Sequence, residues 1–156
     1  MKETTLSQFA DSVASSAPVP GGGSVAAVCG VLSGALSEMV AGLTIGKKKY
    51  AEQEKEMNEI KENALRLRNK LIEYIEKDSI TYNNVMDAYR LPKSTEEEKA
   101  ARKRAIEDCS KLAASVPLEV ACASYEIFPL AEAVVSKGNS NAVTDGLVSA
   151  MLARTA

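Results

Sequence analysis

The feature that most constrains the fold is a long run of small and aliphatic residues, Val25 to Ile45, which follows the segment Pro18-Val19-Pro20-Gly21-Gly22-Gly23-Ser24. The two prolines stiffen the approach, and the glycines allow a tight turn whose backbone N–H groups can face an anion. The run ends at Gly46, before the three lysines at 47–49. These features predict a long helix whose glycine-rich start can approach a ligand closely.

The run carries two stripes at helical spacing. Small residues form one stripe: Gly23, Ala27, Gly30, Gly34, Ser37 and Ala41. Larger apolar residues form the other: Val25, Val28, Leu32, Leu36, Met39 and Leu43. A helix that is apolar on both faces is expected to be buried all round. Glycine inside a helix costs about 1 kcal/mol relative to alanine. The small stripe therefore predicts a close approach by another helix, either in the same chain or as the same helix of a second subunit.

The same run is long enough to span a bilayer. Against a membrane span, Glu38 lies in its middle, serine and glycine are frequent, and no other segment resembles a span. The N-terminus is polar and lacks the apolar stretch of a signal peptide. We therefore expect a buried central helix and no membrane partner.

The composition favours packed helices and excludes several chemistries. Aromatic residues make up 4% and Trp is absent, so small aliphatic side chains must fill the core. The net charge of −2 gives no reason to expect nucleic-acid binding. Histidine is absent, which excludes Ser–His and Cys–His catalysis and histidine-ligated metals. The widely spaced Cys29, Cys109 and Cys122 fit buried thiols of a reduced, cytoplasmic protein.

The rest of the chain predicts further helices. The first ends near Ser16 and is capped by Thr4 or Ser7. A long helix over 47–89 has an apolar seam that Asp78 and Thr81 interrupt. Another helix runs from Ser94 to Lys137, with a kink or split at Pro117. A last helix starts at Val143, after a C-terminal cap at Gly138. No segment has strand periodicity, so we expect one all-α domain over 1–156, a compact bundle of long antiparallel helices.

Two acidic residues are the main candidates for chemistry. Asp78 interrupts an apolar seam, so it is either a desolvated carboxylate suited to proton transfer or a structural acid satisfied by a lysine or a backbone donor. Asp145 lies in the first turn of the last helix, where it either stabilises the helix dipole or serves a site. Glu38 and Glu119 also have apolar neighbours and are structural acids or further site carboxylates.

Two other segments suit an anion. The turn at Gly21–Ser24 follows no strand and precedes no suitably placed lysine, so it is neither a Walker loop nor a Rossmann fingerprint. It either presents N–H groups to an anion or forms a tight turn between helices. Lys47–Lys49 either hold a polyanionic substrate tail or form a solvated helix start.

Four motifs occur in one order and together resemble a known family. They are Pro18–Ala27, Leu43–Tyr50, the group Asp78, Tyr82, Ala88 and Leu91–Lys93, and Gly138–Asp145. The chain is similar to the cyclodeaminase domain of formiminotransferase-cyclodeaminase and to its stand-alone relatives, the methenyltetrahydrofolate cyclohydrolase-like proteins. The resemblance covers nearly the whole chain.

This resemblance implies a homodimeric helical enzyme of tetrahydrofolate one-carbon metabolism. It puts first a cyclodeaminase of histidine degradation, which closes 5-formiminotetrahydrofolate to 5,10-methenyltetrahydrofolate and releases ammonia. Alternatives are a methenyltetrahydrofolate cyclohydrolase and a catalytically silent folate-binding or scaffold protein. A formiminotransferase is an implied partner, and neither a metal nor a cofactor beyond the folate substrate is expected.

The resemblance also implies roles for individual residues. Asp78 and Asp145 would share the acid and base steps. The substrate would be bound by Gly21, Gly22, Gly23, Ser24, Lys47, Lys48, Tyr82, Asn139 and Asn141, with the basic residues facing the anionic glutamate tail. Family members continue beyond the last motif, so truncation of this chain at its C-terminus is an open alternative.

Overall fold

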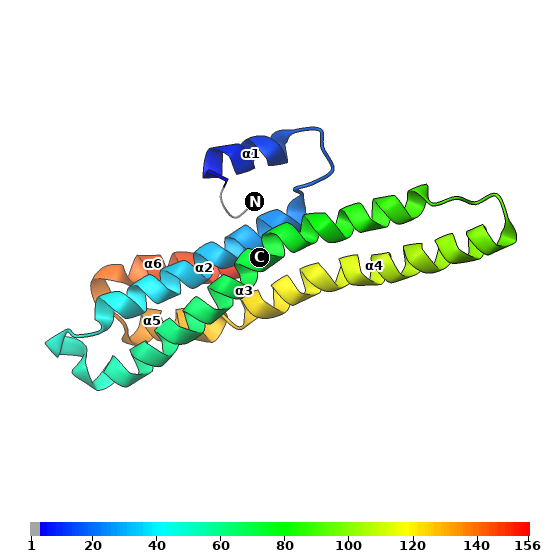
Figure 1. Cartoon of the computed structure of the whole chain (residues 1–156). Coiled ribbons are helices and arrows are strands. Elements are labelled where there is room, and N and C mark those ends of the chain that lie inside the picture. The colour runs from blue at the N-terminus through cyan, green and yellow to red at the C-terminus, as the bar shows by residue number, and fades with distance from the viewer. Residues whose placement is uncertain (1–3) are drawn as a thin grey trace.

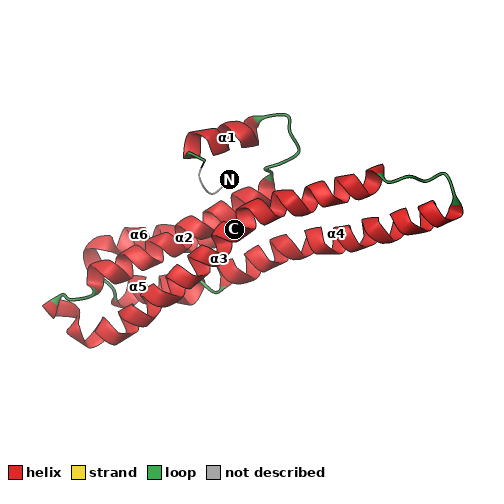
Figure 2. Cartoon of the chain, in the orientation of Figure 1, coloured by secondary structure: helices red, strands yellow, loops and turns green. Residues whose placement is uncertain are grey.

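The computed structural model describes residues 4–156, which form helices and short connections without any strand (Figure 2). The α-helices are α1 (Leu6–Ala14), α2 (Gly22–Thr44), α3 (Glu54–Arg90), α4 (Glu96–Tyr125), α5 (Phe128–Lys137) and α6 (Val143–Thr155). Two 3₁₀ segments, η1 (Lys48–Gln53) and η2 (Ser140–Ala142), lie between them. The expected all-α fold is confirmed. Residues 1–3 of the expected domain lie outside the described part.

Helix α2 is the centre of the bundle and packs against α3, α4, α5 and α6 (Figure 1). Helix α3 has 37 residues and is therefore about 55 Å long. It runs beside α4 past the start of α2, so the molecule is elongated rather than compact. Helix α1 stands apart from the bundle and has no buried residue. Its N-terminal cap is Thr5, which forms a capping box with Gln8, and not Thr4 or Ser7.

The two stripes of α2 differ in burial. The small residues face inward, and Gly34 packs against Arg68 and Ala64 of α3. The large residues remain partly exposed: Val25 36%, Leu32 48%, Met39 41% and Leu43 43%. The prediction that α2 is buried all round is therefore wrong. Its small stripe is also used within the chain and not by a second subunit, because close contact with α3 and α6 requires small side chains.

In α6, too, the small residues are buried and the large apolar residues are at least partly exposed. Its buried residues are Gly146, Ser149 and Ala153, whereas Leu147 and Met151 are mostly exposed. The buried hydroxyls of Ser33, Ser37 and Ser149 bond one another, with 2.8 Å between the Ser37 and Ser149 oxygens. Two helices can approach closely through serine and glycine, and the hydroxyls satisfy one another there.

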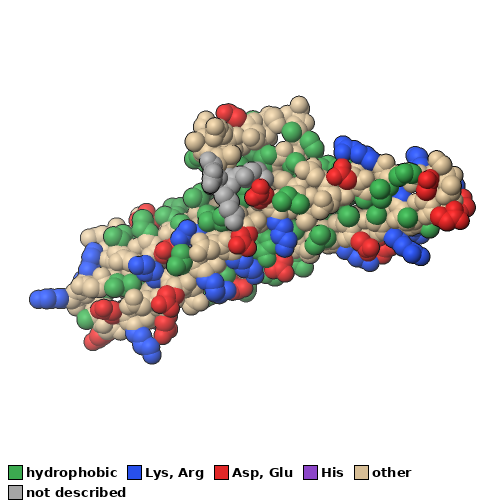
Figure 3. Space-filling model, in the orientation of Figure 1, with side chains coloured by type: hydrophobic (Ala, Val, Ile, Leu, Met, Phe, Trp, Pro, Cys, Tyr) green, Lys and Arg blue, Asp and Glu red, His purple; other side chains and the backbone are tan. Residues whose placement is uncertain are grey.

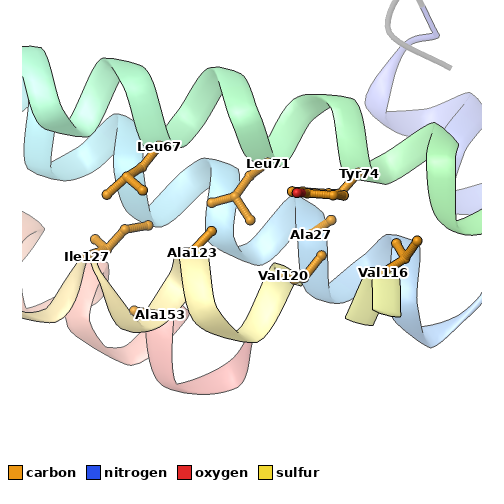
Figure 4. Close-up of a cluster of buried hydrophobic side chains, with 9 residues drawn as sticks. All are labelled: Ala27, Leu67, Leu71, Tyr74, Val116, Val120, Ala123, Ile127 and Ala153. Atoms are coloured by element: carbon orange, nitrogen blue, oxygen red, sulfur yellow. The ribbon is translucent and has the colours of Figure 1, made fainter. Parts of the chain in front are cut away.

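The main core lies between α2, α3 and α4. Figure 4 shows Leu67, Leu71 and Tyr74 of α3 facing Val120 and Ala123 of α4. These side chains are buried, and those of α3 lie in the long helix for which an apolar seam was predicted. Leu112, one turn before the buried Val116 on α4, is 47% exposed.

Three helix boundaries differ from expectation. The segment after Gly46 forms η1, so α3 begins at Glu54 and not at Lys47. Helix α4 continues through Pro117 and ends at Tyr125. The break comes before Pro129 instead, which occupies the first turn of α5, where no backbone N–H is needed. Gly138 is the C-terminal cap of α5, as expected.

The thiols and the hydropathy of α2 also bear on the expectations. Cys29, Cys109 and Cys122 are free, and Cys122 is exposed rather than buried.

Within the described residues, α2 is the helix whose length and hydropathy would allow it to cross a membrane. Here its small face is occupied by α3 and α6. Length and hydropathy alone do not separate a membrane span from the central helix of a bundle.

Candidate functional site

The start of α2 brings a hydroxyl to a carboxylate of α3. Ser24 Oγ lies 2.9 Å from Asp78 Oδ2 and 3.1 Å from the carbonyl oxygen of Ile75. Ser24 is fully buried, and Asp78 is half-buried rather than enclosed. A Cβ at Gly23 would collide with the Asp78 carboxylate. A side chain at position 23 would therefore force the carboxylate away from its present place beside the backbone.

This end of α2 is also a place where negative charge is favoured. Gly21 is the N-terminal cap and supplies no side-chain cap, while the Ser24 side chain turns towards α3. The first backbone N–H groups of a helix have no intrahelical acceptor and carry partial positive charge. Tyr82 follows Asp78 by one turn of α3 and is 38% exposed. Asp78, Tyr82 and the glycine turn thus form one cluster, which we call the Asp78 cluster.

A second cluster lies at the other end of α2. Asn139 is buried, its backbone N–H donates to Thr44 Oγ1 at 2.8 Å, and its Nδ2 donates to the Leu43 carbonyl at 3.2 Å. Its Oδ1 accepts from the backbone N–H of Asn141. The polar atoms of the Asn139 side chain are therefore used within the chain, whereas Asn141 is exposed.

The basic segment reaches the same end of the bundle. Gly46 has φ 76°, a left-handed conformation that suits glycine and turns the chain into η1. Tyr50 Oη accepts the backbone N–H of Ser140 at 3.0 Å and lies 3.1 Å from Ser140 Oγ. The hydrogen bonds from Ser140, together with Lys49, lower the pKa of Tyr50 to about 8. Tyr50 and Ser140 were not among the predicted site residues, because spacing carries no sign that two distant loops meet.

Asp145 begins α6 near this second cluster. The side chain of Asp145 forms no hydrogen bond or ion pair with any residue in 4–156, and neither does the side chain of Lys47 or Lys48. These side chains are free to meet a ligand. We call Lys47, Lys48, Asn139, Asn141 and Asp145 the Asp145 cluster.

The two clusters do not meet within one chain. Helix α6 runs antiparallel to α2, because Asn139 contacts Thr44 whereas Ser149 contacts Ser33. Asp145 therefore lies level with the C-terminal half of α2, and Asp78 lies at its first turn. At 1.5 Å per residue this separates the carboxylates by roughly 20 Å or more. The single chain does not bring the two predicted catalytic residues together.

The other acidic candidates have structural partners. Glu38 Oε2 accepts from Arg68 Nε at 2.9 Å, and both side chains are partly buried. Glu119 accepts from Tyr74 Oη at 3.1 Å and pairs with Lys70 at 3.5 Å. We therefore assign both glutamates to the packing of α3 against its neighbours. Within 4–156 no three Cys, Asp or Glu residues gather in a way that could hold a metal ion.

A surface hollow of the described chain lies elsewhere. It is an open apolar groove of about 710 Å³ beside α5 and α6, and its lining includes Tyr125, Phe128, Leu147 and Ala150. None of the candidate site residues borders it. On the face shown in Figure 3, acidic and basic side chains are interspersed with exposed hydrophobic ones, without a field of one sign.

Comparison with known proteins identifies the class of protein. The family model of formiminotransferase-cyclodeaminase matches residues 5–156. The chain belongs to this family, and the resemblance seen in the motifs is confirmed. It is thus an enzyme of folate one-carbon metabolism, of the cyclodeaminase and cyclohydrolase type.

Individual relatives carry different activities in their names. A methenyltetrahydrofolate cyclohydrolase of Methylorubrum extorquens is 45% identical over 149 residues, which cover 96% of this chain and 72% of that protein. The mouse formimidoyltransferase-cyclodeaminase is 28% identical over 153 residues, and the match spans 28% of its length. The crystal structure of a formiminotetrahydrofolate cyclodeaminase from Thermotoga maritima superposes with a TM-score of 0.85 at 37% identity, covering 98% of this chain and 72% of that one.

Proposed function

We propose that this protein is a methenyltetrahydrofolate cyclohydrolase, which hydrates 5,10-methenyltetrahydrofolate to 10-formyltetrahydrofolate. The observation that carries this choice is the 45% identity to the Methylorubrum cyclohydrolase. The resemblance of the motifs put the cyclodeaminase first and the cyclohydrolase second, but the motifs are shared by both kinds of enzyme and do not separate the two reactions. The match to the mouse enzyme spans 28% of that enzyme, so its transferase activity is not part of the proposal.

The Asp78 cluster suits this hydration. In the reaction, water attacks the methenyl carbon and gives up one proton, which passes through the base to solvent. The bond from that carbon to N5 then breaks, the second proton of the water moves to N5, and the oxygen becomes the formyl carbonyl on N10. The substrate carries a positive charge on its methenyl bridge, so the step needs a base for water more than a strong acid. Asp78 serves as that base. The Ser24 hydroxyl, 2.9 Å away, holds the carboxylate in place.

We further propose that the working site is formed between two copies of the chain. Several large apolar residues of α2 that are at least partly exposed are spaced seven, four, three and four positions apart, as in a helix-pairing seam: Val25, Leu32, Leu36, Met39 and Leu43. Partly exposed large apolar residues at this spacing are typical of a subunit interface. A twofold axis through the middle of this seam pairs the two α2 helices in antiparallel fashion.

Antiparallel pairing would bring the separated clusters together. The seam is centred near Gly34, so Ser24 of one copy would lie beside Thr44 of the other, where Asn139 is bound. Each Asp78 cluster would then face the Asp145 cluster of the second copy. Parallel pairing would leave the clusters apart, which is why we choose the antiparallel arrangement.

Within this composite site the predicted binding residues have distinct tasks. Lys47 and Lys48 face the carboxylates of the folate tail, and Asp145 positions the substrate or relays a proton. Asn139 shapes the loop and leaves ligand contact to Asn141, because its own side chain already has partners. Tyr82, on the Asp78 side, offers a ring surface to the pterin.

The proposal is tested by supplying both candidate substrates to the purified protein. With 5,10-methenyltetrahydrofolate we expect the methenyl absorbance to decay faster than in buffer, with 10-formyltetrahydrofolate as the product. With 5-formiminotetrahydrofolate we expect no ammonia. Ammonia release with accumulation of the methenyl compound would instead establish the cyclodeaminase, the second candidate, which the Thermotoga structure favours. Saturable binding without turnover would identify a silent folate-binding protein.

A further inference from the structure

Tyr50 connects two loops that the sequence keeps 90 positions apart. Its Oη accepts the Ser140 backbone N–H at 3.0 Å, and the Ser140 hydroxyl lies 3.1 Å from the same atom. Lys49 Nζ lies 3.4 Å from Ser140 Oγ. The phenol thus has two partners on η2, and the lysine beside it has one.

We propose that Tyr50 is a positioning residue: an ionisable latch that holds the basic segment 47–49 against Ser140 and so aligns two segments of the Asp145 cluster. This rests on the proposed function only in its consequence for substrate binding. The latch itself is a property of the free protein. The phenol does not act on substrate directly, because its oxygen is already engaged with Ser140.

The surroundings of the phenol favour its ionised form. The charged group that faces it is Lys49, whose Nζ lies 5.0 Å from the ring centroid. On η2 and its cap, Ser140, Asn139 and Asn141 are uncharged, so no acid there opposes a phenolate. The hydrogen bonds from Ser140 are the main reason that the pKa falls to about 8. A phenolate accepts both Ser140 donors in charge-assisted hydrogen bonds, which are stronger than neutral ones. The latch therefore tightens as the pH rises through 8.

The latch has a consequence for the site. The side chains of Lys47 and Lys48 have no partner within 4–156, so their place relative to Asn141 depends on how the backbone of segment 47–49 is held, to which the Tyr50 anchor contributes. Loss of the anchor would leave the lysines on a loose loop and weaken substrate binding. It would leave the Asp78 cluster, at the far end of α2, intact.

The first test needs no substrate. Tyrosine ionisation is followed by absorbance in the wild type, in Tyr50→Phe and in the control Tyr125→Phe, whose ring is 74% exposed. We expect one tyrosine to titrate near pH 8, and this step to vanish only in Tyr50→Phe. The Ser140 amide resonance should shift with the same midpoint. Identical titrations in wild type and Tyr50→Phe, or an amide that does not respond, would overturn the latch. If Tyr50→Phe fails to fold, Ser140→Ala should move the titration back towards 10.

The second test separates positioning from catalysis. In Tyr50→Phe the KM for methenyltetrahydrofolate should rise about five- to tenfold, as expected for loss of a hydrogen-bonded anchor, while kcat stays within about twofold. The wild-type KM should fall between pH 7 and 9, and the variant's should not. A loss confined to kcat would contradict the positioning role. If the wild type does not turn over folate, the proposed function fails, and the titration and amide shift still decide the latch.

Discussion

Ser24 Oγ of α2 lies 2.9 Å from Asp78 Oδ2 of α3, across 54 positions of sequence. Glycine at position 23 makes this contact possible, because any side chain there would occupy the space of the carboxylate. The motif at Pro18–Ser24 and the acid at position 78 are therefore one structural unit. Substitutions at Asp78 test the chemistry of this unit, and substitutions at Gly23 test its packing.

Replacing Asp78 with Asn should abolish turnover while the fold persists. The amide has nearly the same shape as the carboxylate but cannot accept a proton from water. We expect kcat to fall at least about 100-fold, with unchanged circular dichroism. Asp87→Asn is the matched control, since Asp87 lies on the same helix and its exposed carboxylate pairs with Arg90. A normal rate in Asp78→Asn would exclude it as the base.

Gly23→Ala should lower both activity and stability, whereas Gly22→Ala should leave stability unchanged. The added methyl group at position 23 would push the Asp78 carboxylate away, and overpacking of this kind costs about 1–3 kcal/mol. At Gly22 an added methyl group would meet no neighbouring element within 4 Å in the described part of the chain. Urea unfolding and the hydration assay measure the two effects. Equal behaviour of the two variants would show that the close approach is unimportant.

Mixing two inactive variants should restore activity if the site is shared. Asp78→Asn and Asp145→Asn each remove the carboxylate of one cluster. A dimer of one variant chain with the other then contains one site in which both carboxylates are wild type. Random reassembly of equal amounts should regain up to about a quarter of wild-type activity, since half of the dimers are mixed and each has one of two sites intact. Both variants must first be shown to be inactive alone. No recovery after subunit exchange would place the site within one chain.

Leu32→Glu should break the proposed pairing of α2 without unfolding the chain. Leu32 is 48% exposed, so the charge can be solvated in the monomer but not in an apolar interface. We expect a monomer by analytical ultracentrifugation, together with loss of activity. Leu118→Glu on α4, where leucine is 65% exposed, is the control and should stay dimeric. If Leu32→Glu still dimerises with unchanged affinity, the partly exposed apolar face of α2 is not the subunit interface.

The loss of folding stability above pH 10 should depend in part on the ionisation of Tyr74. This buried phenol donates to Glu119, and burial followed by that hydrogen bond raises its pKa above 10.0. Above pH 10 the unfolded chain ionises this tyrosine while the folded chain keeps it neutral, so stability falls as the pH rises. Tyr74→Phe should cost about 1 kcal/mol at pH 7 and should show a shallower fall between pH 10 and 11 in urea unfolding. An unchanged slope would contradict this role.

Local sequence patterns predict the all-α class, the central helix and the family motifs. These follow from local periodicity and from residue types such as Gly23 and Asp78, whose order in the chain is visible directly. The sequence also indicated that Gly30 and Gly34 need close packing. It did not show which helix packs against these glycines. Gly34 packs against α3 of the same chain, so Gly34→Leu should destabilise the folded monomer itself and not only its assembly.

How the helices pack determines which face of α2 is buried and where Asp78 and Asp145 lie. Both stripes of α2 are apolar, so hydrophobicity does not choose between them. Close packing with α3 and α6 selects the small residues and leaves Leu32 and Met39 exposed. The distance between Asp78 and Asp145 depends on the antiparallel course of α3 and α6 along α2. Such non-local relations follow from packing geometry and have no periodic trace in the sequence.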